Sequence, residues 1–162
     1  MNRDMHSTHR LARSIEPAAY TNNDTTTNGA WVNVADVASI EAFMTFDDTT
    51  DVLAAALNWE AWVEKAKDDG SGAADASTAL DLTEEQYLGA STELATPADG
   101  TGICFLDAPA EDDKEFRVGV RALGGGYEWV RINLRGNGNH VDGSVAFGGF
   151  IFTPQSRPVA NP

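Results

Sequence analysis

The residue types best suited to nucleophilic chemistry are few in this chain. A Cys–His pair can supply a nucleophile and its base, and the sequence has one cysteine and three histidines. Cys104 lies in the apolar run ICFL, His6 and His9 lie near the N-terminus, and His140 lies in GNGNHVDG. Spacing alone leaves a Cys104–His140 dyad open, but the apolar neighbours of Cys104 favour a small buried cysteine.

Acidic and glycine-rich runs are the remaining candidates for chemistry. FDDTTD and APAEDDKE lack the alternating oxygen ligands and central glycine of an EF-hand loop, so we interpret them as solvated turns. GGG and RGNGNH lack the Lys-Ser/Thr and the following helix of a phosphate-binding loop, and no G-x-S-x-G motif occurs. We therefore predict no catalytic residue, no metal ligand and no cofactor, and we expect the protein not to be an enzyme.

Positive charge is concentrated in one segment of an acidic chain. The 162 residues carry a formal charge of −14 and only 11 Lys+Arg. Four arginines nevertheless fall within EFRVGVRALGGGYEWVRINLRG, residues 115–136. In both halves of this segment apolar residues alternate with polar ones, which predicts two strands. The glycines 124–126 accept positive φ, so the two strands are predicted to form a hairpin whose arginines share one outer face.

This arginine face has two interpretations. It is either a solvated sheet surface whose arginines pair with nearby acids, or a protein–protein contact, because Arg, Trp and Tyr are enriched at binding hot spots. Residues 36–115 hold twenty Asp+Glu against three Lys. The arginine face of one copy could therefore contact the acidic region of a second copy. The predicted interface residues are Arg13, Arg117, Arg121, Tyr127, Trp129, Arg131 and Arg135.

The elements around this segment indicate an all-β protein. Short runs with period-two alternation, bounded by Gly, Asn, Asp or Pro, predict a single antiparallel β-sandwich, jelly-roll-like, over residues 30–152. LAAALNWEAWVEKAK also fits a helix, but its two tryptophans and valine favour a strand over LNWEAWVEK. Residues 1–29 and 153–162 are expected to be an extended arm and tail that bury surface mainly against other chains. The predicted core is Ile40, Ala42, Met44, Trp59, Ala61, Val63, Ile103, Phe105, Phe116, Val118, Val120, Val130, Ile132, Leu134, Phe150 and Phe152. Because FGGFIF breaks simple alternation, Ile151 is the alternative to Phe150 and Phe152.

Bulk composition excludes several partner classes. No window approaches the ~18 apolar residues of a membrane span, and the polar N-terminus predicts no export signal. A single cysteine fits a reducing compartment. The acid excess argues against nucleic acid as a partner, because duplex binding needs positive charge.

Six segments follow one another along residues 12–159: ARSIEPAAYTNN, VASIEAFMTF, WEAWVEKAKDDGSG, QYLGAST, the paired-strand block 115–136 and FGGFIFTPQSRPV. This order of segments resembles that of a family of small structural proteins of tailed bacteriophages. It implies a virion protein, made in the host cytoplasm, that acts as a capsid decoration (cement) protein. The major capsid protein and further copies in a homotrimer are the implied partners. The alternatives are a tail or head–tail connector component, and a carbohydrate-binding sandwich that uses Trp31, Trp59, Trp62 and Trp129, although core packing is favoured for Trp59.

Overall fold

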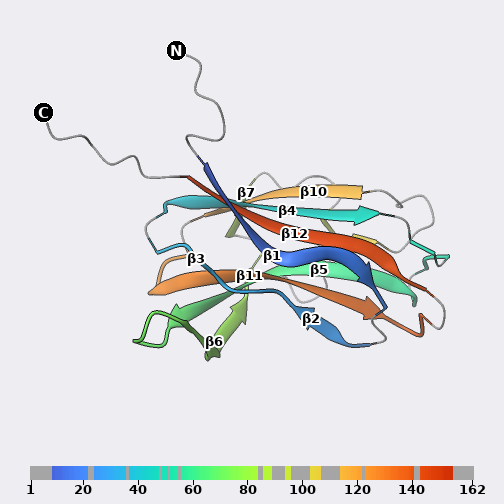
Figure 1. The fold of residues 1–162 in the computed structure, drawn as a ribbon, viewed down its shortest axis with the longest axis horizontal. Helices are drawn as coiled ribbons and strands as arrows, with labels where there is room; N and C mark the ends of the chain where they lie inside the picture. The colour runs from blue at the N-terminus through green and yellow to red at the C-terminus, as the bar shows by residue number, and fades with distance from the viewer. Residues whose placement is uncertain are drawn as a thin grey trace, which may run out of the picture.

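The computed structural model describes most of the chain and shows two stacked β-sheets (Figure 1). The described residues are 9–21, 24–35, 37–47, 49–50, 52–54, 56–83, 86–88, 94–95, 103–106, 114–121, 123–140 and 143–154. They form twelve strands, and all the strand pairs are antiparallel. The prediction of an all-β sandwich is confirmed.

Each sheet collects strands from distant parts of the sequence. The five-stranded sheet has the order β1 (His9–Tyr20), β12 (Val145–Pro154), β4 (Ser39–Asp47), β10 (Lys114–Arg121), β7 (Tyr87–Leu88). The seven-stranded sheet has the order β2 (Thr26–Asn28), β11 (Tyr127–Asn137), β5 (Asn58–Asp68), β9 (Ile103–Leu106), β8 (Leu94–Ala95). In this second sheet β3 (Val32–Asn33) also pairs with β11, and β6 (Ala74–Asp81) also pairs with β5.

Period-two alternation builds the core between the sheets. In β4 the side chains alternate between buried and partly exposed from Ile40 to Phe46, because successive side chains of a strand point to opposite faces. β5 is a strand and not a helix, and Trp59 is fully buried. Of the predicted core residues, those confirmed as buried are Ile40, Ala42, Met44, Trp59, Ala61, Val63, Phe116, Val118, Val120, Val130, Ile132 and Leu134. The side chains of Ile103 and Phe105 lie outside the described ones.

The prediction that Phe150 and Phe152 belong to the core is wrong. Ile151 is fully buried and both phenylalanines are only partly buried. Gly149 occupies the inward position two residues before Ile151, where an added Cβ would lie 3.2 Å from Ile132. The glycine thus keeps the alternation of β12 intact, and Phe150 and Phe152 fall on the outer face.

The predicted boundary of the N-terminal arm is also corrected. Residues 9–20 form β1, which pairs with β12 from His9↔Pro154 to Tyr20↔Val145, and β2 pairs with β11. These residues therefore bury surface within their own chain, and the sandwich extends over residues 9–154. Composition alone did not reveal this, because Ile15 is the one apolar side chain of β1 that is fully buried among the described residues. Residues 1–8 and 155–162 lie outside the described residues.

One polar junction ties β1 to the opposite sheet. The backbone N–H of Ile132 donates to Ser14 Oγ over 2.8 Å, and Ser14 Oγ donates to the carbonyl of Ala30 over 3.0 Å. The backbone of Gly29 lies so close that an added Cβ would be 2.4 Å from the Ile132 carbonyl oxygen. β2 and β3 pair with different parts of β11, and the Ile132 N–H lies between these two parts. Ser14 Oγ therefore accepts the hydrogen bond that a backbone carbonyl would otherwise accept.

Candidate interaction surfaces

The arginine-rich segment 115–136 does not form a hairpin. β10 lies in the five-stranded sheet and β11 in the seven-stranded sheet, so the intervening glycines carry the chain from one sheet to the other. Gly124, Gly125 and Gly126 have φ of 65°, 59° and 79°, which confirms the predicted positive φ. The connection was misassigned because consecutive strands usually pair. The apolar faces of the two strands meet across the core and not side by side.

The prediction that four arginines share one face is therefore wrong. Arg117 and Arg121 point outward from the five-stranded sheet, whereas Arg131 and Arg135 point outward from the seven-stranded sheet. Arg13 pairs with Phe150 in register and belongs to the first of these faces. The predicted interface residues are thus divided between opposite sides of the sandwich.

On the seven-stranded sheet Arg131 is held by its own chain. Its Nε donates to Glu64 Oε2, on the residue directly opposite in β5. The side chains of this pair are 16% and 14% exposed. Asn133 also donates to Glu64, over 3.1 Å, and the guanidinium carbon of Arg131 lies 4.4 Å from the centre of the Trp31 ring. Arg131 is thus fixed by an ion pair and a cation–π contact.

Two tryptophans of this face also bind acids of the same chain. Trp62 Nε1 donates to Asp81 over 2.7 Å, and Trp129 Nε1 donates to Asp68 over 3.1 Å. Arg135 lies opposite Glu60 in register, with 3.9 Å between Nε and Oε1. These internal pairs match the interpretation in which the arginines pair with nearby acids of the same chain, although Arg131 and Glu64 are mostly buried.

The outer face of the five-stranded sheet has a different character. Leu11 lies opposite Phe152 in β12, and Phe43 of β4 lies opposite Phe150. The Phe43 ring centre is 6.5 Å from that of Phe150 and 6.4 Å from that of Phe152. Leu11 is 54% exposed and the three rings are partly exposed. We call Leu11, Phe43, Phe150 and Phe152 the apolar row.

Only part of the apolar row could be predicted from the sequence. Phe43 has the opposite phase to Ile40, Ala42 and Met44, so the alternation already placed it on the outer face. The position of Leu11 depended on the pairing of β1 with β12, which join residues more than a hundred positions apart. No local pattern identifies such a pair.

Charges flank the apolar row. Arg117 lies 2.6 Å from Glu41, and the side chains of this pair are 68% and 37% exposed. Arg13 lies 3.1 Å from Glu16 at the edge strand β1. Both pairs are open to solvent, so each is worth ~0–1 kcal/mol to the isolated domain. Their contribution grows where a neighbour removes water from them.

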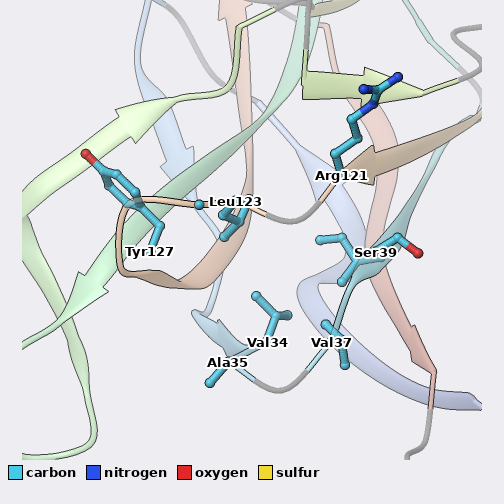
Figure 2. Close-up of a pocket in the computed structure, with 9 residues that line it drawn as sticks. Val34, Ala35, Val37, Ser39, Arg121, Leu123 and Tyr127 are labelled. Atoms are coloured by element: carbon cyan, nitrogen blue, oxygen red, sulfur yellow. The ribbon is translucent and has the colours of Figure 1, made fainter.

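A pocket of about 110 Å³ opens at one end of the sandwich. Figure 2 shows Arg121 and Tyr127 on opposite sides of it, above Val34, Ala35 and Val37. Lys65 makes a cation–π contact with Tyr127, with its Nζ 4.6 Å from the ring centre. The predicted residues Arg121 and Tyr127 thus border one small hollow between the sheets, from which the guanidinium group of Arg121 extends away (Figure 2).

Of the candidate Cys104–His140 dyad, the structure describes the side chain of His140 only. Cys104 pairs with Ala61 in register, and its side chain lies outside the described ones. His140 is buried, with its ring centre 4.5 Å from that of Trp59. Among the residues that the structure describes, no three His, Cys, Asp or Glu side chains gather as metal ligands. The described part of the chain also contains no helix long and apolar enough to cross a membrane.

Comparison with known proteins adds no relative. No protein-family model, no curated protein and no solved structure matches this chain.

Proposed function

We propose that this chain is a structural protein of a bacteriophage virion, of the kind that decorates the capsid and stabilises it through protein–protein contacts. The major capsid protein and further copies of the chain are its proposed partners, and the virion is its proposed location. Neither nucleic acid nor a membrane is among the proposed partners. The order of segments that resembles small phage head proteins is the first support for this proposal.

The observation that carries the proposal is the apolar row on a rigid sheet face. The row crosses three adjacent strands, β1, β12 and β4. Partly exposed apolar side chains gathered on one face and flanked by charged residues are typical of surfaces that bind proteins. The paired strands β1, β12 and β4 hold these side chains in place before binding, which lowers the entropic cost of association.

The pairing of the first described strand with the last one is a second support. His9 pairs with Pro154, so the first and last described residues lie side by side, two residues from Leu11 and Phe152. Attachment to a capsid suits a rigid core with terminal segments that reach a neighbouring subunit. Many modest contacts are then multiplied by the symmetry of the shell.

The carbohydrate-binding alternative has less support from the seven-stranded sheet. Trp59 is buried in the core, and the indole N–H groups of Trp62 and Trp129 already donate to aspartates of the same chain, so they are not available to a sugar hydroxyl. A glycan platform needs aromatic faces that are free to stack. Trp31 already lies against Arg131.

The proposal is tested on particles purified from cells that make this chain together with the phage head proteins. Copies of the chain at regular positions on the outer shell, seen by electron cryomicroscopy, are the expected result. Copies confined to a ring at the tail or at the portal would establish the other virion role. Particles without the chain, while it accumulates free in the lysate, would refute both.

A further inference from the structure

The apolar row lies in a face whose charge differs from that of the whole protein. By register, the outward charged side chains of β1, β4 and β10 are three arginines and three acids. They are Arg13, Arg117, Arg121, Glu41, Asp47 and Glu115. Glu16, paired with Arg13, adds one further negative charge at the edge. This face is therefore close to neutral in a chain of −14.

We propose that the outer face of the five-stranded sheet binds a second copy of this chain. Two copies that each carry −14 repel at long range, so they can pack closely only where the local charge is balanced. A face with three positive and four negative side chains has charges of both signs to offer, so it suits a partner with the same composition. A uniformly acidic partner would instead select a basic face, and a basic partner would select the acidic surfaces elsewhere on this chain.

The geometry of the face fits such a contact. Two sheets pack face to face about 10 Å apart when apolar side chains interdigitate between them. Phe43, Phe150 and Phe152 provide rings at the centre, and Leu11 extends the row to the edge strand. Arg117 and Glu41 stand beside the rings, and in the single chain the Arg117 side chain is largely exposed and that of Glu41 is partly exposed. Each can therefore bind the opposite charge on another copy, with less water around the pair than in the free chain.

This inference rests on the proposed function, since it names the partner of the same face, but it is tested on the purified full chain alone, so its failure is distinguishable from failure of the virion role. The test is the mass of the protein in solution, measured by sedimentation equilibrium over a wide concentration range. The wild type is expected to form an oligomer. Leu11→Asp should raise the protein concentration at which half of the oligomer dissociates at least about tenfold, because it buries a charge within the apolar row.

Leu80→Asp is the matched control, since Leu80 is 53% exposed on β6 of the other sheet, compared with 54% for Leu11. This variant should associate as the wild type does. A second pair of variants tests the charges: Arg117→Glu should weaken association, and Arg117→Glu combined with Glu41→Arg should restore most of it. Far-UV circular dichroism confirms that each variant keeps the fold.

Three results would overturn the proposal. One is a wild type that stays monomeric at every concentration. Another is an oligomer that Leu11→Asp and Leu80→Asp weaken equally, or that neither weakens. The third is an unchanged oligomer combined with loss of binding to phage heads by Leu11→Asp, which would assign the face to the capsid protein.

Discussion

Ser14 and Ile132 lie 118 positions apart and share a buried hydrogen bond, in which the Ile132 N–H donates to Ser14 Oγ over 2.8 Å. This bond joins β1 of one sheet to β11 of the other, so it holds the edge strand that carries Leu11.

The first prediction concerns this bond. Ser14→Ala should lower the free energy of unfolding by about 1–3 kcal/mol, because it leaves a buried N–H without a partner. Urea unfolding measures this loss, and Ser77→Ala on the exposed strand β6 serves as the control, with an expected loss below ~0.5 kcal/mol.

Gly29 should tolerate no side chain. A Cβ at this position would lie 2.4 Å from the Ile132 carbonyl oxygen and 2.5 Å from Ser14 Oγ, so Gly29→Ala must push β1 away from β11. We expect a loss of more than ~2 kcal/mol, which is large for a single methyl group. Gly70→Ala is the comparison, because Gly70 has positive φ but nothing within 4 Å of an added Cβ. Its loss should be only the ~1–2 kcal/mol of left-handed backbone. Equal losses for the two variants would show that the close approach at Gly29 is not what makes it necessary.

The two arginine–glutamate pairs should differ in strength. Arg131 and Glu64 are mostly buried, whereas Arg117 is largely exposed and Glu41 is partly exposed. A double-mutant cycle with Arg131→Met and Glu64→Gln should give a coupling of about 1–3 kcal/mol, because little water screens the pair. The same cycle for Arg117 and Glu41 should give less than ~1 kcal/mol in the isolated chain. If the exposed pair couples as strongly as the buried one, burial does not determine these energies.

Tyr20 should make stability depend on alkaline pH. Burial and the negative charge of Glu16 raise the pKa of the Tyr20 phenol above its ordinary value of 10.0. The folded state therefore keeps this proton at a pH where the unfolded state has begun to lose it. This contribution to stability is complete below pH 10 and declines as the pH rises through the folded-state pKa. Urea unfolding of the wild type and of Tyr20→Phe, from pH 8 to 11, should show the advantage of the wild type shrinking at the alkaline end. A constant difference would contradict the shifted pKa.

How far the sequence predicted this protein depends on whether a feature is local. Alternation within one strand correctly placed Val118, Val120 and Ile132 in the core, because the side-chain period of a strand needs no knowledge of its partners. Pairing between strands was less predictable. Arg121 and Arg131 are ten positions apart but lie in different sheets, whereas Leu11 and Phe152 are neighbours. The apolar row depends on such a distant pair, so it could not be predicted from the sequence. The local clustering of arginines indicated a different surface instead.

The central claim is that the outer face of the five-stranded sheet is where this protein meets other subunits. The most direct test is an electron cryomicroscopy structure of the particle at a resolution that shows side chains. We expect Leu11, Phe43, Phe150 and Phe152 to pack against a neighbouring subunit, with Arg117 and Glu41 inside the same contact. An assembled particle in which these four apolar side chains face solvent, while the protein attaches through the outer face of the seven-stranded sheet, would contradict it.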